Sequence, residues 1–130
     1  MIEVRVGTVR ILHASDVGHS PPAEIVSLFR GIDLLLVPIG GNFTIGAAQA
    51  WEWIHRLRPK RVVPIHFQTA ACDLPLLPLS LFQTYFPATP TTTREFLDLT
   101  ETEKSNSTTV VYLREAVSYT HLTLPTICSV

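Results

Sequence analysis

Residues 33–67 read DLLLVPIGGNFTIGAAQAWEWIHRLRPKRVVPIHF, and this stretch decides the fold. Asp33–Ile39 is a Leu- and Val-rich run without alternation, which is typical of a strand buried on both faces. Apolar side chains then recur at helical spacing over Ala47–Leu57. Arg61–Ile65 follows as a second buried strand. A strand, a helix and a strand in this rhythm predict parallel strands joined by a right-handed crossover.

Outward from this unit, the pattern continues in both directions and predicts an α/β fold (α+β in some schemes). Polar–apolar alternation, glycines, prolines and β-branched runs mark the remaining elements. The predicted elements are strands over Ile2–Val6, Thr8–His13 and Ser107–Leu113, helices over Ala23–Arg30 and near Leu79–Phe86, and a polar, loop-rich segment over Thr91–Asn106. The apolar face of the first helix is predicted to hold Ile25, Leu28 and Phe29.

The helix over Ala47–Leu57 contains both tryptophans of the chain. Trp51 shares a helix face with Ala47, Ala50, Ile54 and Leu57, so it is expected in the core. Trp53 lies about 200° further round the helix. It is therefore expected to face solvent or a further part of the domain.

Length and composition exclude several classes of protein. The chain has 130 residues, enough for one domain, and a net charge of −1 without a basic block, which does not indicate a nucleic-acid surface. The longest apolar stretch, Ile32–Ile39, is too short to span a bilayer. The N-terminal residues have no apolar segment typical of a signal peptide. A cytoplasmic protein that does not enter the membrane is the expectation.

Two metal-capable side chains follow the ends of predicted strands. Asp16 lies just after the strand that ends at His13, and His66 follows the strand that ends at Ile65. Sites in open α/β sheets form at the carboxyl ends of the strands. A carboxylate and an imidazole brought together there can hold zinc or a similar divalent ion. Taken singly, such an Asp is commonly a turn residue, and such a His is as often structural.

Three motifs, taken in order, resemble a known family. They are Ser15-Asp16-Val17-Gly18, Pro38-Ile39-Gly40-Gly41-Asn42-Phe43-Thr44 and Pro64-Ile65-His66-Phe67. Their order and spacing resemble the metallo-β-lactamase superfamily, in the branch similar to ascorbate-phosphate lactonases and related metal-dependent hydrolases. The resemblance covers Thr8–Thr69, about half of the chain.

The resemblance implies a function and roles for particular residues. Asp16 would be the metal-bridging carboxylate and His66 a ligand of the second metal, so both are expected at one sheet edge with polar atoms within about 5 Å. The metal would be divalent, with zinc expected and manganese or iron as the other candidates. A metal-activated hydroxide would attack an ester, lactone, amide or phosphoester in a small-molecule substrate. The residues expected near that substrate are Gly40, Gly41, Asn42 and Thr44.

The chain departs from the family in one main respect. The family signature His-x-His-x-Asp-His is absent, because no two of the five histidines (His13, His19, His55, His66 and His121) are spaced by one residue. Residues 1–116 are therefore predicted to be the C-terminal part of the domain, half of an αββα sandwich, and inactive alone. His13 and His55 are expected to have no role in the site, and His19 to be an exposed loop residue.

A lone half-sandwich would expose apolar strand surface near Leu34–Val37 and Val62–Ile65. Poor solubility or oligomerisation is therefore expected. The alternative to the hydrolase fragment is a non-catalytic α/β binding module of receiver-like or nucleotide-binding type. Gly40-Gly41 lacks the glycine spacing of the known phosphate-binding loops, which disfavours that alternative.

The last residues differ in kind from the rest. Val117–Val130 reads VSYTHLTLPTICSV, contains no charged side chain, and resembles the in-frame translation of a transposase-type sequencing adapter. Such segments are excluded from fold reasoning, which removes His121 and Cys128 as candidate ligands. The tail is predicted to contribute nothing to the stability of residues 1–116.

Overall fold

The computed structural model of the chain describes residues 1–15, 17–41, 44–65, 67, 79–84, 91–94, 97–99 and 108–113. These residues form a six-stranded sheet with the strand order β1-β2-β3-β4-β6-β5. The strands are β1 (Ile2–Val6), β2 (Val9–His13), β3 (Leu34–Pro38), β4 (Arg61–Ile65), β5 (Thr91–Arg94) and β6 (Thr109–Leu113), and the helices are α1 (Ala23–Phe29), α2 (Ala47–Leu57) and α3 (Leu79–Gln83). The predicted α/β class is confirmed.

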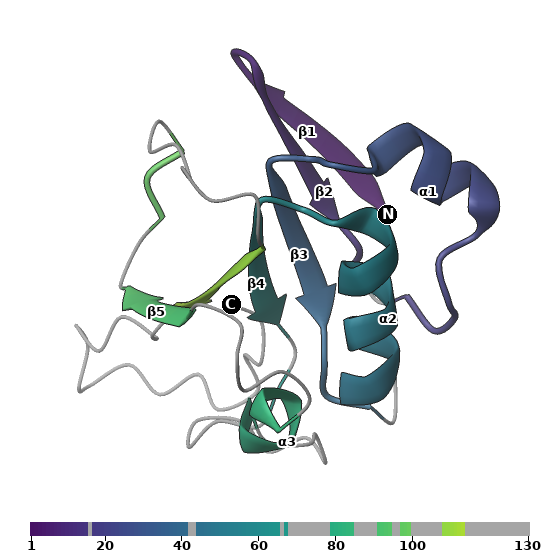
Figure 1. Ribbon diagram of the computed structural model, residues 1–130, viewed down its shortest axis with the longest axis vertical. Coiled ribbons are helices and arrows are strands. Elements are labelled where there is room, and N and C mark those ends of the chain that lie inside the picture. The colour runs from purple at the N-terminus through teal and green to yellow at the C-terminus, as the bar shows by residue number, and fades with distance from the viewer. Residues whose placement is uncertain are drawn as a thin grey trace, which may run out of the picture.

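Strand β1 is antiparallel to its neighbour, and all the other neighbouring strands of the sheet are parallel. β1 and β2 form an antiparallel hairpin, whereas β2, β3, β4, β6 and β5 run parallel to their neighbours. The register places His13 beside Leu36, and Leu36 beside Val63. The carboxyl ends of β2, β3 and β4 therefore lie next to one another (Figure 1).

Helices α1 and α2 pack against one face of the sheet (Figure 1). The main core on this face joins Leu12, Leu35 and Val62 of the strands to the buried side of α2. That side of α2 consists of Ala47, Ala50, Trp53, Ile54 and Leu57. Helix α2 has the predicted bounds, and its apolar face accounts for them.

The prediction for Trp53 was wrong, whereas Trp51 packs against the main core as predicted. Trp53 is fully buried, whereas Trp51 is half-buried. Trp53 lies three residues after Ala50 and four before Leu57, so it belongs to the same stripe of the helix. Its indole N–H donates to the carbonyl of His19, at 2.9 Å, which satisfies its polar atom inside the core.

The opposite face of the sheet is also covered where the parallel strands lie. Every residue of β4 is buried, and in β3 only Leu36 is half-buried. A second cluster on this face contains Leu34, Val63, Ile65 and Val111, with Leu97 and Leu99 packed against it. The expectation that β3 and β4 expose apolar surface was therefore wrong. The large exposed apolar residues in the described part are Met1, Ile2, Val4, Val6 and Leu28.

Two further details differ from the prediction. Thr91–Arg94 is a strand, although its polar composition favoured a loop, because its β-branched threonines pair with β6. Leu28 is 62% exposed, whereas Ile25 and Phe29 of the same helix pack against the core. Residues 114–130 lie outside the described residues, so the boundary at residue 116 and the nature of the tail stay predictions.

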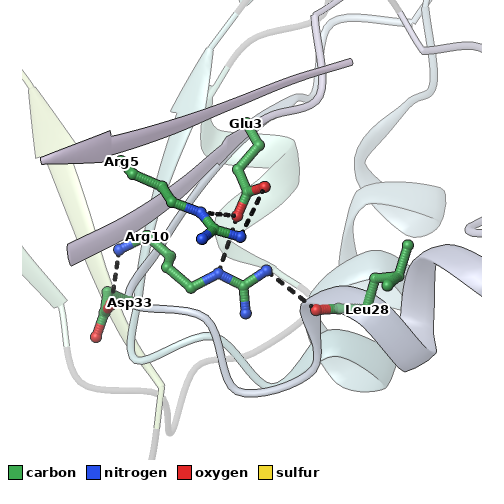
Figure 2. A network of polar contacts seen from close by, with 5 residues as sticks. All are labelled: Glu3, Arg5, Arg10, Leu28 and Asp33. Carbon is green, nitrogen blue, oxygen red and sulfur yellow. Dashed lines mark hydrogen bonds and ion pairs between the residues drawn. The ribbon is translucent and has the colours of Figure 1, made fainter. Parts of the chain in front are cut away.

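Asp33 ties the first hairpin to the start of β4 (Figure 2 shows its contact with Arg10). Its carboxylate accepts from the Arg10 backbone N–H at 2.8 Å and lies 3.2 Å from Nζ of Lys60. Partial burial raises the pKa of Asp33, but the Arg10 and Lys60 contacts outweigh burial and lower the pKa below its ordinary value. The ionised carboxylate therefore stabilises the folded chain.

Replacing Asp33 by Asn is expected to lower the free energy of unfolding by about 1–2 kcal/mol at neutral pH, the usual scale for a hydrogen bond to a charged group. Because the folded pKa is lowered, this stabilisation is fully present above the unfolded pKa and is lost as the pH falls through the folded pKa. Urea unfolding at neutral pH and in acid measures the difference. A difference between Asp33→Asn and wild type that stays constant into acid would contradict the assignment.

Candidate functional site

The segment after β2 makes a tight, fully anchored turn. Ala14 is buried and its N–H donates to the carbonyl of Leu36 at 2.9 Å. Ser15 has a φ of 56°, in the left-handed region that few side chains favour. Its N–H donates to Nδ1 of His13 at 2.9 Å, and its hydroxyl lies 3.3 Å from the same nitrogen. His13 therefore stabilises the turn through its ring. Its position in a predicted strand did not indicate this role.

The segment after β3 folds back on itself. Gly40 bridges Gly46 in antiparallel fashion, and the N–H of Gly41 donates to the carbonyl of Ile45 at 3.1 Å. Gly41 has a φ of 69°, which glycine adopts without strain. Gly40 and Gly41 are buried, and Thr44 is half-buried with its hydroxyl donating to the Ile45 carbonyl. This closed loop leads directly into α2.

Two backbone hydrogen bonds join the strand ends into one unit. The N–H of Ile45 donates to the carbonyl of Val17 at 2.9 Å, which fixes the β3 loop to the β2 loop. The N–H of Ile39 donates to the carbonyl of Ile65 at 3.0 Å, which fixes the β3 loop to the end of β4. Phe67, beyond β4, packs against the main core. The segments around the predicted sites are thus held at one sheet edge.

Three of the predicted site residues lie outside the described part of the chain. They are Asp16, Asn42 and His66. Their described neighbours Ser15, Val17, Ile65 and Phe67 lie in the segments just described. The predicted separation of Asp16 and His66 stays a prediction. Among the described residues, no three His, Cys, Asp or Glu side chains gather as a metal site.

A cavity of about 260 Å³ opens beside the β2 turn. The described residues that line it are Met1, Ala14, Ser15, Val17 and His19. His19 is exposed, as expected, but it stands at the rim of this cavity. Its Nδ1 lies 2.8 Å from the carbonyl oxygen of Ser20. A carbonyl only accepts, so Nδ1 carries the proton and a neutral ring keeps its lone pair at Nε2.

Helix α2 anchors the segment that carries His19. The Trp53 indole donates to the His19 carbonyl, the Ser20 hydroxyl donates to Glu52 at 2.9 Å, and Arg56 donates to the Pro21 carbonyl at 3.0 Å. Sequence reasoning did not find these positioning contacts. The spacing of Glu52, Trp53 and Arg56 on one side of the helix was the available signal.

Comparison with known proteins then places the chain. A family model for the β-lactamase superfamily domain matches residues 1–66. The chain belongs to the β-lactamase superfamily. The chain also resembles a solved structure from Thermotoga maritima, which is described as a putative Zn-dependent hydrolase of the metallo-β-lactamase superfamily. The TM-score is 0.68 at 30% sequence identity, over 83% of this chain and 55% of the other. The predicted superfamily and fold class are confirmed, whereas the branch similar to ascorbate-phosphate lactonases stays a prediction.

Curated relatives of this chain are named UPF0173 metal-dependent hydrolase. The protein of Pelotomaculum thermopropionicum is 38% identical over 66 residues, which are 51% of this chain and 29% of the relative. That of Thermus thermophilus is 41% identical over 68 residues, 52% of this chain and 30% of the relative. The chain thus spans less than a third of the curated relatives it matches.

The anchoring by α2 makes a testable prediction. Trp53→Phe removes the N–H that the His19 carbonyl accepts, so the free energy of unfolding should fall by about 1–2 kcal/mol. Exchange of the backbone amides near His19 should accelerate more than that of the β4 amides. Hydrogen exchange read by NMR, alongside urea unfolding, measures both. Equal acceleration throughout the chain would mean that Trp53 only fills the core.

Proposed function

We propose that this chain carries one side of a metal-dependent hydrolase site, at the carboxyl edge of β2, β3 and β4. The observation that carries the proposal is the pair of backbone bonds, Ile45 to Val17 and Ile39 to Ile65, which join the loops next to Asp16 and His66. The name that these relatives share, UPF0173 metal-dependent hydrolase, supports the proposal. The family match ends at residue 66 and includes both segments, which does not favour the non-catalytic alternative.

Asp16 and His66 are the residues proposed to hold the metal. A carboxylate and an imidazole suit zinc, and manganese or iron accept the same donors. The turn at Ser15 and the open cavity beside it lie at this edge of the sheet. When bound, a divalent ion supplies Lewis acidity and lowers the pKa of a coordinated water. His19, with Nδ1 tied to Ser20, is positioned to contact a bound molecule from the rim.

The substrate is proposed to be a small molecule with an ester, lactone, amide or phosphoester bond, as in the ascorbate-phosphate-lactonase-like branch. The cavity of about 260 Å³ beside the β2 turn offers space for such a molecule at this edge. Gly40, Gly41 and Thr44, the described residues proposed to lie near the substrate, belong to the loop that the Ile45 N–H joins to the Val17 carbonyl. In the described part of the chain, no helix has the length and apolarity needed to cross a membrane.

The donor set of this chain is incomplete for catalysis. Catalytic zinc normally has three protein ligands and one open position, and the family motifs supply only Asp16 and His66 here. We therefore expect weak zinc binding, and no hydrolysis of ester or phosphoester reporters by the chain alone. Calorimetric zinc titration should show weak binding that Asp16→Ala and His66→Ala abolish. His55→Ala, which removes an exposed histidine on α2, is the matched control and should bind like wild type.

Two results would count against this proposal. Zinc binding that survives both Asp16→Ala and His66→Ala would remove these residues as ligands. Reporter hydrolysis that EDTA abolishes would show that the chain alone holds a complete site.

A further inference from the structure

The backbone on either side of Asp16 is held by main-chain hydrogen bonds. Before it, the N–H of Ala14 donates to the carbonyl of Leu36 at 2.9 Å. After it, the carbonyl of Val17 accepts from the N–H of Ile45 at 2.9 Å. Because both bonds join backbone groups, they do not depend on the side chain at either position. The sheet and the β3 loop therefore fix the chain just before and just after the proposed metal ligand.

Ser15, between these two bonds, has an unfavourable backbone conformation. Its φ of 56° lies in the left-handed region, which costs free energy for a residue with a side chain. Such conformations persist only where contacts hold them, and they gather at functional sites. The contact here comes from a side chain, because the Ser15 N–H donates to Nδ1 of His13 at 2.9 Å and the Ser15 hydroxyl lies 3.3 Å from the same nitrogen. One imidazole therefore holds the residue that precedes Asp16.

The place of His13 in the sheet explains how its ring reaches the turn. His13 ends β2, where it pairs with Ile2 of β1 and with Leu36 of β3. Leu12 lies in the main core, so the half-buried side chain of His13 projects from the opposite face of the sheet. A nitrogen that accepts from a backbone N–H carries no proton, so the neutral ring has its proton on Nε2. The ring therefore acts on the turn as a hydrogen-bond acceptor.

We propose that His13 is a positioning residue of the metal site, which sets the direction in which Asp16 presents its carboxylate. The inference rests on the proposed function, in which Asp16 is a metal ligand. A change in φ at Ser15 rotates the peptide bond that leads into Asp16. A carboxylate oxygen binds zinc at about 2.0–2.2 Å, so a small rotation is enough to break that contact. Residues that orient a ligand in this way are needed for full metal affinity.

Two substitutions at His13 separate the acceptor from the bulk of the ring. His13→Phe keeps a planar ring and removes the acceptor. His13→Asn supplies a side-chain carbonyl, and an Asn side chain hydrogen-bonds the backbone N–H two residues further on. Titration with zinc alone, followed in the amide NMR spectrum, measures the dissociation constant even where binding is weak. His13→Phe should raise the constant about tenfold or more, and His13→Asn should return it close to the wild-type value. His13→Ala, which removes the acceptor without adding bulk, should behave like His13→Phe.

A second measurement needs no metal. Hydrogen exchange of the Ser15 amide should accelerate in His13→Phe and stay slow in His13→Asn, whereas the Ala14 amide, bonded to the Leu36 carbonyl, should change little in either variant. A merely structural role would lower the stability towards urea and leave the zinc dissociation constant of the folded chain unchanged. His55→Ala is the matched control, since it removes an exposed histidine on α2.

Asp16→Ala, titrated alongside, separates this inference from the proposed function. If Asp16→Ala abolishes zinc binding while His13→Phe binds zinc like wild type, the role of His13 is wrong and the metal site stands. If zinc binding survives Asp16→Ala, the metal-site assignment is wrong and the role of His13 falls with it. Zinc binding lost equally in His13→Phe and His13→Asn, with unchanged exchange at Ser15, would make the imidazole itself a ligand and would also overturn the inference.

Discussion

The parallel pairing of β2, β3 and β4 is the constraint on which the rest of the molecule depends. Because the three strands run the same way and in register, their carboxyl ends meet, and every loop of the candidate site starts there. A slip of β3 by one residue would exchange its two buried faces and move Leu35 out of the main core. The burial of β3 and β4 on both faces therefore fixes the edge on which the site is built.

The helix α2 links this edge to the core. It begins at Ala47, directly after the loop that bridges Gly40 to Gly46, and it buries Trp53 under the segment that holds His19. The same helix therefore packs the sheet and positions the rim of the cavity. The hydrogen bond from the Trp53 indole to the His19 carbonyl links the core to the rim of the cavity, and Met1, just before β1, lines the same cavity.

The sequence was sufficient to predict the parts that local patterns determine. Continuous apolar runs predict buried strands at β3 and β4, and the apolar stripe predicts a helix at α2. The predicted bounds of these elements agree closely with the structure. The position of Trp53 was missed because the predicted apolar stripe was centred on Trp51, although Trp53 is also at helical spacing from Ala50 and Leu57 on the buried side. β5 was missed because three threonines read as polar, although pairing with β6 makes them a strand.

The site itself was predicted in outline. The motifs placed Asp16 and His66 after β2 and β4, and the family match bears out the superfamily to which those motifs belong. The roles of His13 and His19 could not be predicted, because they depend on local backbone geometry: the left-handed turn at Ser15 for His13, and the orientation of the Ser20 carbonyl for His19. Nothing in residue spacing reports such contacts.

The measurement that tests the central claim most directly is the distance between positions 16 and 66. Spin labels on Asp16→Cys and His66→Cys, with Cys72 and Cys128 replaced by Ser, report it through dipolar broadening of the EPR spectrum. A matched pair on positions 16 and 60 places the second label at the opposite end of β4. The shared edge predicts strong broadening for 16 with 66 and little for 16 with 60. Equal spectra for the two pairs, or broadening only in the control pair, would contradict it.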